Sequence, residues 1–349
     1  VFDFDSGFGV WELESTTLIF DYKDKLGSGN FGKVYKGIWQ SGGGVYENIV
    51  PRQDTAVAIK EIEIREPRKR EKDPNINATA AAAATSTYLA KNKITEEFLR
   101  EASIMRSLRH PNIINLVGVL SISLPYTIVI EFMANGDLRT FLRRNSIARN
   151  YKSDVLVKIM KQIASAGAYM EKYQVIHRDL RASNVLVGKN VERDCKLADF
   201  GLSRTLPNLK RGERMRVKNS DDEDEEDDYK YLTDHDYYKP LKKPNFPVRW
   251  TAPESIKNYH FSTKSDVWSF GIFMFEVATK GKLPYSDLDN HEVKEQVVNY
   301  EIELPNLNVS CFKKDRFRFL KELELAMKAC LEFEVKERAY FSGILPFFE

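Results

Sequence analysis

Hydrophobic and polar residues alternate in two stretches near the N-terminus, residues 18–36 and 55–64. β-branched and aromatic residues supply the apolar positions, and glycine-rich turns bound both stretches. Because successive side chains of a strand point to opposite faces, this period of two predicts strands of an antiparallel sheet. A further strand pair is predicted at residues 115–119 and 126–132.

The spacing becomes helical at residues 94–108, before a break at Pro111 and Asn112. One face of this segment carries apolar residues three and four positions apart: Phe98, Leu99, Ala102, Met105 and Leu108. This predicts one amphipathic helix packed on the sheet. Downstream, a long amphipathic helix is marked by Val155, Ile159, Ile163 and Met170, and later helices are predicted at residues 265–279 and 319–331. The second part of the chain is therefore predicted to be mainly helical.

Two stretches of the sequence are not expected to belong to a hydrophobic core. Residues 66–92 join a basic run to an alanine run, and residues 205–231 join a basic half to the acidic run at 221–228. Both compositions are typical of mobile insertions.

The composition is that of a soluble globular protein, with 42% hydrophobic and 30% charged residues among 349. This length allows two cores. The formal charge of +2 provides no strong field, so nucleic acid and membrane surfaces are not expected partners. No apolar run approaches the roughly 20 residues that a spanning helix needs, which predicts no membrane contact within this segment. Three scattered cysteines without metal spacing indicate reduced, cytosolic thiols.

The chain does not begin with methionine, which predicts a segment of a longer protein. We expect it to lie in the cytoplasm, and a spanning segment upstream would make it the cytoplasmic domain of a membrane receptor.

A glycine motif, GxGxxGxV, runs from Gly27 to Val34 between two predicted strands. Glycines allow backbone N–H groups to approach phosphate oxygens closely. A dinucleotide-binding fingerprint would need a helix after Gly32, whereas the pattern continues as a strand. The motif therefore favours a hairpin that covers phosphates.

Lys60 follows on the next strand, in the sequence Val-Ala-Ile-Lys. An ammonium on an apolar strand needs a carboxylate and a phosphate as partners, and Glu101 on the predicted helix is the expected carboxylate. An isolated strand lysine is more often a solvated charge, but the order of glycine loop, lysine and glutamate supports both assignments together.

Two further motifs follow: His-Arg-Asp-Leu-Arg-Ala-Ser-Asn at 177–184 and Asp-Phe-Gly at 199–201. They supply a base and two magnesium ligands in the order that phosphoryl transfer requires. A lone histidine such as His177 is more often a buried core residue, yet several ordered motifs are not explained by chance.

These motifs resemble the protein kinase family, from about Trp11 to about Phe341. Thr-Ala-Pro-Glu at 251–254, Ser-Asp-Val-Trp-Ser-Phe-Gly at 265–271 and Arg338 also match. The resemblance implies an α+β, two-lobed fold. It places a small N-lobe of antiparallel sheet plus one helix at about residues 18–132, and a larger, mainly helical C-lobe at about 133–349.

The resemblance also implies ATP and Mg²⁺ as cofactors. Lys60, paired with Glu101, is expected to contact the α and β phosphates, Asn184 and Asp199 to hold Mg²⁺, and Asp179 to accept or orient the proton of the substrate hydroxyl. Besides Lys60, the implied nucleotide-binding residues are Leu26, Gly27, Ser28, Gly29, Asn30, Phe31, Gly32, Val34, Ala58, Ile130, Glu131, Met133, Asp137 and Leu186.

Arg181 and the sequence Phe-Pro-Val-Arg-Trp at 246–250 resemble the tyrosine kinase form of the family, which implies protein substrates that contain tyrosine. The loop at Arg181 is similar to Src-type kinases, whereas Tyr237 and Tyr238 are spaced as in receptor kinases. A dual-specificity or serine/threonine kinase remains an alternative. A pseudokinase scaffold would be expected to have lost the lysine, the base or a metal ligand, and none is missing.

The last expectation concerns regulation. Tyr237 and Tyr238 lie where related kinases are phosphorylated, and Arg178 is placed to bind the phosphate. A dimer for trans-phosphorylation is an expected partner arrangement. The acidic run at 221–228 is interpreted as a solvated insertion that pairs with its own basic half.

Overall fold

The structure is a computed structural model that describes residues 9–29, 32–41, 53–62, 80–144, 153–206, 237–240, 244–305 and 317–348. The chain forms two compact units. Unit 1 comprises Val1–Arg109 and Ile114–Met133, and unit 2 comprises His110–Ile113 and Ala134–Glu349. The chain therefore passes from one unit to the other after Met133, apart from one short excursion.

The short segment His110–Ile113 is held in unit 2 by hydrogen bonds of a polar side chain. The amide of Asn112 donates to Gln162 Oε1 (3.2 Å) and to the carbonyl oxygen of Cys195 (3.0 Å), both in unit 2. A buried amide needs such partners, so this loop packs with residues distant in the sequence.

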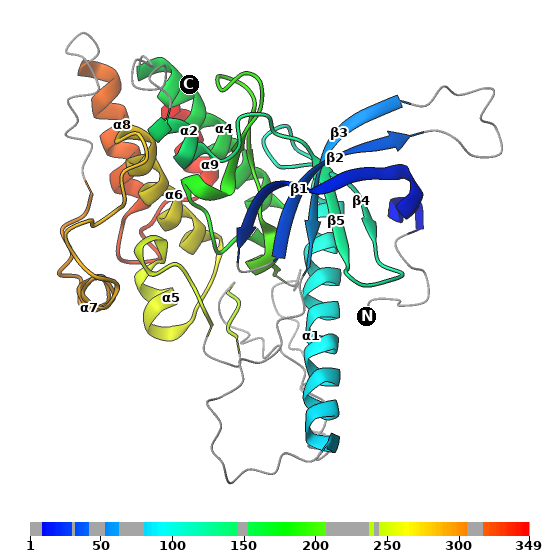
Figure 1. The fold of residues 1–349 in the computed structure, drawn as a ribbon. Helices are drawn as coiled ribbons and strands as arrows, with labels where there is room; N and C mark the ends of the chain where they lie inside the picture. Colours follow the sequence, from blue (N-terminus) through cyan, green and yellow to red (C-terminus); the bar gives the residue numbers. More distant parts are fainter. Residues whose placement is uncertain are drawn as a thin grey trace. The chain divides into compact units, whose positions relative to one another are not determined.

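Unit 1 is an antiparallel sheet with the strand order β1-β2-β3-β5-β4 and one helix, α1, beside β4 (Figure 1). The elements are β1 (Leu18–Gly29), β2 (Gly32–Ser41), β3 (Gln53–Glu61), α1 (Ala80–Ser107), β4 (Leu116–Leu120) and β5 (Thr127–Glu131), preceded by 3-10 turns at Gly9–Trp11 and Ser15–Thr17. The predicted strands are confirmed within the described residues, and the predicted helix is the second half of α1.

The core of unit 1 follows the predicted alternation. Leu18, Val57, Ile59 and Val129 form a buried cluster on one face of the sheet. Phe98 and Ala102 are the most buried described residues of α1, at 1% and 0% exposure. The period-two and helical patterns thus place their apolar faces where the sequence predicts them.

Helix α1 begins at Ala80, so the predicted start at residue 94 is wrong. The additional turns contain the alanine run. Alanine has the highest helix propensity, so a helix continues through such residues without an apolar face of its own. Residues 80–92 of the predicted insertion are thus helical, and the rest of that insertion lies outside the described residues.

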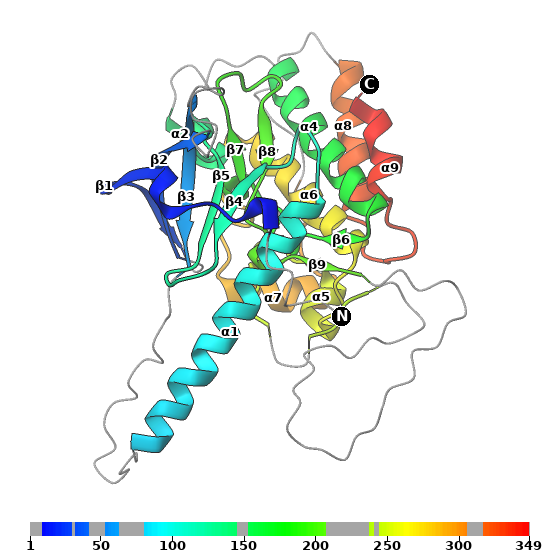
Figure 2. The same ribbon diagram turned by 90° about the vertical axis from the view of Figure 1, so that its right-hand side faces the viewer.

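Unit 2 is mainly helical, with two small two-stranded antiparallel sheets, β6–β9 and β7–β8 (Figure 2). Its helices are α2 (Leu138–Arg144), α4 (Ser153–Lys172), α5 (Pro253–Asn258), α6 (Thr263–Ala278), α7 (Asn290–Val298), α8 (Phe317–Cys330) and α9 (Phe341–Ile344). Its strands are β6 (Val175–Ile176), β7 (Val185–Val187), β8 (Cys195–Leu197) and β9 (Arg204–Thr205), and its 3-10 turns are Ala182–Asn184, Phe200–Leu202, Val248–Trp250 and Leu345–Phe348.

Helix α6 is the central element of unit 2, since it packs against both α4 and α8. Nearly all of its residues are buried, which is why an apolar run without strong amphipathicity forms a helix here. Ser262 and Ser265 form a reciprocal capping box at its start. The long helix predicted through Val155 and Met170 is α4, and the two later helices that the sequence predicts are α6 and α8.

Among the described residues, no helix combines the length and the apolar character needed to cross a membrane.

Candidate active site

In unit 1, Lys60 and Glu101 form an ion pair. The Nζ atom of Lys60 on β3 lies 2.7 Å from Oε1 of Glu101 on α1, and their side chains are 13% and 5% exposed. Lys60 and Ala58 are two residues apart on β3, so they share the face opposite the buried Val57 and Ile59. The pairing predicted from the sequence is therefore present.

The glycine motif forms the β1–β2 hairpin, in which Gly29 pairs with Gly32. Gly32 has φ +132°, and a Cβ atom there would lie 1.8 Å from the carbonyl oxygen of Glu61. Only glycine fits this backbone approach. Asn30 and Phe31 lie outside the described residues, and Ser28 and Gly29 are described by their backbone alone.

The remaining predicted nucleotide residues of unit 1 surround Lys60 in the sheet register. Val34 pairs with Lys60 and with Gly27, and Ala58 pairs with Ile130. Leu26 is 51% exposed and Met133 is buried. The Oε1 atom of Glu131 accepts from the backbone N–H of Asn115 at 2.8 Å, which fixes the end of β5.

In unit 2, Asp179 and Arg181 lie in the loop before the 3-10 turn Ala182–Asn184. Arg181 Nε lies 2.9 Å from Oδ1 of Asp179, whose side chain is only 5% exposed. Burial raises the pKa of Asp179 to about 6, against the opposing effects of Arg181 and of a hydrogen bond from Asn184. The carboxylate is thus a stronger base than an exposed aspartate, yet it is ionised at neutral pH.

His177 is a neutral core residue of this loop. Its Nδ1 atom accepts from the backbone N–H of Asp179 (3.3 Å), so Nε2 carries the proton that it donates to the carbonyl oxygen of Ala198 (3.1 Å). Burial lowers its pKa to about 4. The ring also contacts Phe200 edge-to-face, with centroids 5.0 Å apart. His177 therefore links the aspartate loop to the Asp-Phe-Gly segment.

Two buried carboxylates on α6 fix the loop by accepting N–H groups. Asp266 accepts from the backbone N–H of His177 (2.6 Å) and of Arg178 (2.9 Å). Glu276 Oε2 accepts from the backbone N–H of Ala182 (2.8 Å) and from the indole of Trp250. Burial raises the pKa of each carboxyl group to about 7.

Sequence reasoning missed this positioning role of Asp266 and Glu276. The available signal was clearest for Glu276, whose neighbours in α6 are apolar, since a carboxylate in a buried helix requires donors from elsewhere in the fold.

Asn184 and Asp199 meet at one end of the β7–β8 hairpin. Asn184 precedes β7 and Asp199 follows β8, and the backbone N–H of Ala198 donates to the carbonyl oxygen of Asn184 at 2.8 Å. The side-chain N–H of Asn184 donates to the carbonyl oxygen of Asp179 (2.8 Å), so its amide oxygen is the remaining ligand atom. An amide oxygen and a carboxylate are a donor set that suits Mg²⁺.

Leu186 and Asp137 are also adjacent in unit 2, where they form an isolated antiparallel bridge. Asp137 Oδ1 accepts from the backbone N–H of Thr140 at 2.8 Å, so this carboxylate caps α2. Its second oxygen is the atom through which the predicted contact with nucleotide would be made.

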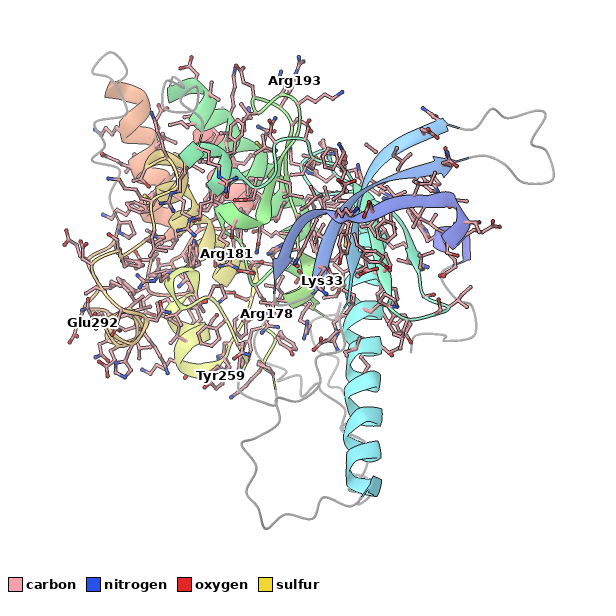
Figure 3. The ribbon with its side chains drawn as sticks, in the orientation of Figure 1. Lys33, Arg178, Arg181, Arg193, Tyr259 and Glu292 are labelled. Carbon is pink, nitrogen blue, oxygen red and sulfur yellow. The ribbon has the colours of Figure 1, made fainter. Side chains whose placement is uncertain are left out.

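The guanidinium of Arg178 makes cation–π contacts with the rings of Tyr238 and Phe261. The Arg178 guanidinium, labelled in Figure 3, lies 4.9 Å from the ring centroid of Tyr238 and 4.2 Å from that of Phe261. Tyr238 is buried, whereas Tyr237 is partly exposed and stacks on His260 with centroids 3.9 Å apart. The predicted regulatory residues thus lie side by side, and the two tyrosines differ in exposure.

Of the predicted catalytic residues, Lys60 and Glu101 belong to unit 1, and the rest belong to unit 2. Within each unit, the structure brings these residues together through hydrogen bonds, ion pairs or strand pairing. The predicted insertion at 205–231 lies almost entirely outside the described residues.

Comparison with known proteins identifies the family. Residues 20–346 match the protein kinase domain. The tyrosine-protein kinase transforming protein Abl of Abelson murine leukemia virus is 32% identical over all of this chain and 36% of its own length. Tyrosine-protein kinase ABL2 of Mus musculus is 32% identical over 97% of this chain and 22% of its own length.

Tyrosine-protein kinase SRK3 of Spongilla lacustris is 33% identical over 82% of this chain and 65% of its own length. The chain thus spans between about a fifth and two thirds of the length of these relatives. The family match covers nearly all of the chain, and the structure has the sheet-based and helical units that this family's two-lobed fold requires. The chain belongs to the protein kinase family.

Proposed function

We propose that the chain is a protein tyrosine kinase, which transfers the γ-phosphoryl group of ATP to tyrosine hydroxyls of protein substrates. The observation that carries this proposal is the ion pair of Asp179 with Arg181, 2.9 Å apart in a buried loop of the tyrosine kinase form. The relatives named above support it, because each is named as a tyrosine-protein kinase.

Asp179 acts as the base or the orienting group in this proposal. Its pKa of about 6 leaves it ionised at neutral pH, and a base is most efficient when its pKa lies near the working pH. Arg181 keeps the carboxylate in one orientation, and its guanidinium can approach the phosphoryl group from the position that a tyrosine acceptor requires. His177 and Asp266 fix the backbone of this loop and do not themselves react.

Lys60 binds the α and β phosphates, and Glu101 orients its ammonium. The β1–β2 hairpin presents backbone N–H groups to the phosphates. In this proposal, adenine contacts apolar side chains and backbone groups of the residues that the sequence predicts in unit 1: Leu26, Val34, Ala58, Ile130, Glu131 and Met133.

Protein kinases in general use ATP with Mg²⁺. Asn184 and Asp199 would hold the ion in this chain through their amide and carboxylate oxygens. When bound, Mg²⁺ neutralises the negative charge of the phosphates. The fixed hairpin end positions both ligands before the ion binds, which reduces the entropy cost of forming the site.

Regulation, partners and compartment complete the proposal. Phosphorylation of Tyr237 and Tyr238 would bring a phosphate to Arg178, which a second copy of the chain could supply in a trans-phosphorylating dimer. We also propose that the domain acts in the cytosol, as a cytoplasmic enzyme or as the cytoplasmic part of a receptor.

A peptide assay with labelled ATP tests the proposal. The peptides are matched and differ only in whether the acceptor is tyrosine, serine or threonine. The protein should phosphorylate the tyrosine peptide at least about a hundredfold faster than the other two. Asp179→Asn serves as the control for phosphate transfer by a contaminating kinase. Equal phosphorylation of the serine and tyrosine peptides would show a dual-specificity enzyme. If the protein binds ATP but phosphorylates none of the peptides, it is a scaffold and not an enzyme.

A further inference from the structure

The guanidinium of Arg249 binds a loop that lies 35 to 41 positions downstream in the sequence. Its Nη1 atom donates to the carbonyl oxygens of Pro284 (3.0 Å) and Tyr285 (2.5 Å). Its Nη2 atom donates to the carbonyl oxygen of Leu288 (2.6 Å), and its Nε atom donates to Oδ1 of Asn290 (2.9 Å). One side chain therefore holds this downstream loop by four hydrogen bonds, all within unit 2.

This loop, residues 284–290, which we call the anchored loop, has a conformation that is unfavourable by itself. Tyr285 has φ +52°, in the left-handed region that a bulky side chain rarely adopts. Its hydroxyl oxygen is buried and has no hydrogen-bond partner among the described residues, which is a further cost. Three carbonyl oxygens of the loop accept from the same guanidinium, and they would lose these donors without it. The conformation of the anchored loop therefore depends on Arg249.

The 3-10 turn that carries Arg249, Val248–Trp250, is fixed on its other side by α6. The indole N–H of Trp250 donates to Oε2 of Glu276 at 2.9 Å, and the carbonyl oxygen of Trp250 accepts from the hydroxyl group of Ser269 at 2.8 Å. The turn packs against both α6 and α7. Two adjacent residues, Arg249 and Trp250, thus hold the turn between α6 and the anchored loop.

The same turn adjoins the proposed catalytic base. The guanidinium carbon of Arg181, a residue labelled in Figure 3, lies 5.3 Å from the ring centroid of Trp250, and its Nε atom lies 2.9 Å from Oδ1 of Asp179. The carboxylate of Glu276 that accepts from Trp250 also accepts from the backbone N–H of Ala182 at 2.8 Å. Shared contacts thus set the positions of the turn and of the loop that carries Asp179. We therefore expect a peptide whose tyrosine reaches Asp179 to lie beside this turn.

We propose that Arg249 is a positioning residue for the acceptor segment of the protein substrate. By joining the turn Val248–Trp250 to the anchored loop, it keeps the surface beside Asp179 in one conformation. Arg249 acts through these contacts and not on the reacting atoms, because all three of its side-chain nitrogen atoms bind the anchored loop. This inference rests on the proposed function and extends substrate positioning to residues 284–290. Small displacements of an acceptor strongly reduce the rate of transfer, so the loss should be measurable.

Three variants test the inference with the tyrosine peptide and labelled ATP. Arg249→Gln should lower kcat/KM for the peptide about tenfold, because the acceptor is misplaced. The KM for ATP should stay within about twofold, since none of the partners of Arg249 belongs to the predicted nucleotide site. Arg249→Lys keeps the charge but lacks the planar fork, so it should restore kcat/KM to about threefold below that of the unmodified protein. Asn290→Ala removes only one of the four acceptors and should have the smallest effect.

A matched control separates positioning from a general loss of stability. Glu171 on α4 holds the start of α9 in a comparable way, since its carboxylate accepts from the backbone N–H of Phe341 (2.8 Å) and from the backbone N–H and the hydroxyl group of Ser342. Glu171→Ala removes these hydrogen bonds, and thermal unfolding should show a decrease similar to that of Arg249→Gln. Only Arg249→Gln should lose activity towards the peptide.

Full kcat/KM in Arg249→Gln would overturn the inference and leave the proposed function intact. Equal losses of activity in Arg249→Gln and Glu171→Ala would do the same, because they would show general destabilisation. If Arg249→Gln does not fold, Arg249→Lys decides the question, and an unchanged kcat/KM in that variant would overturn the inference. Failure of the unmodified protein to phosphorylate any tyrosine peptide would instead refute the proposed function, and the inference with it.

Discussion

In unit 1, the ammonium of Lys60 pairs with the carboxylate of Glu101, whereas in unit 2 the carboxylates of Asp266 and Glu276 accept backbone and indole N–H groups. The first arrangement joins two side chains to which the proposed function assigns phosphate binding. The second joins side chains to the backbone of the loop that carries Asp179. The Lys60–Glu101 pair is thus proposed to serve ligand binding, whereas Asp266 and Glu276 fix the backbone of the loop that carries Asp179.

This difference has an energetic consequence. Removing Lys60 leaves a glutamate that can become neutral by taking up a proton, which limits the cost to the fold. Removing Asp266 leaves two buried backbone N–H groups without an acceptor, and these cannot be neutralised. Substitution of Lys60 should therefore reduce activity more than stability, whereas substitution of Asp266 should reduce the stability of the fold.

The largest effect is expected for Lys60→Met and Asp179→Asn. Both should reduce phosphoryl transfer by about a thousandfold or more, because each group acts on the transition state and not on the fold. Peptide phosphorylation measures the loss, and thermal unfolding shows that the domain is folded. Lys23→Met removes an exposed lysine from β1 and should retain full activity. Near-normal transfer by either of the first two variants would refute the mechanism.

Asp266→Ala tests the structural role of the carboxylate in unit 2. It should lower the free energy of unfolding by about 2–5 kcal/mol, since two buried N–H groups lose their acceptor. Asp266→Asn keeps one oxygen and should cost less. Chemical denaturation measures both, with the exposed Asp287→Ala as the control. A loss below about 1 kcal/mol would show that the loop does not depend on this carboxylate.

The same division explains which parts of the fold could be predicted from the sequence. Strands and long helices with a regular apolar period, such as the strand of Val57 and Ile59 and the helix of Phe98, lie where the pattern predicts them. The short helices α2, α5 and α7 were not predicted, because fewer than three turns do not establish a period. The start of α1 depends on alanine propensity, which no apolar face signals.

Side chains that we propose to bind a ligand were also easier to pair from the sequence than those that position the backbone. The pairing of Lys60 with Glu101 follows from ordered motifs in the sequence. The contacts of Asp266 with the N–H groups of His177 and Arg178 span 89 and 88 positions and require the packing of α6, which a local pattern does not contain. The stacking of Tyr238 on Arg178 is a tertiary contact of the same kind.

A smaller effect on activity is expected from pH, through the protonation of Asp179. Burial raises the pKa of Asp179 to about 6, so kcat/KM should fall about tenfold per pH unit below pH 6, as the carboxyl group loses its ability to accept a proton. Arg181 opposes this rise, so Arg181→Gln should move the acidic limb to higher pH. Initial rates between pH 5 and 8 measure the limb.

Stability should not follow the same course. The folded-state pKa values of Asp179, Asp266 and Glu276 lie above their ordinary values, so the stability that these groups contribute is lost as the pH rises from about 4 through 6–7. His177 acts in the opposite direction, because its lowered pKa removes stability as the pH falls from 6.5 to about 4. Circular dichroism at each pH distinguishes an activity limb from unfolding, and an activity that stays constant down to pH 5 would contradict the role of Asp179.

The smallest effect is expected at Tyr237 and Tyr238, which lie in unit 2 beside the arginine whose backbone Asp266 fixes. Preincubation with Mg²⁺ and ATP should activate the unmodified protein several-fold, because a phosphate adds roughly two negative charges for Arg178 to bind. Tyr237 should be modified first, since it is more exposed than Tyr238. Tyr237→Phe with Tyr238→Phe should lose most of the activation, whereas Tyr300→Phe, at an exposed tyrosine, should keep it. Time courses of activity with mass spectrometry of both sites measure this. Full activation of the double variant would refute the switch at these two tyrosines.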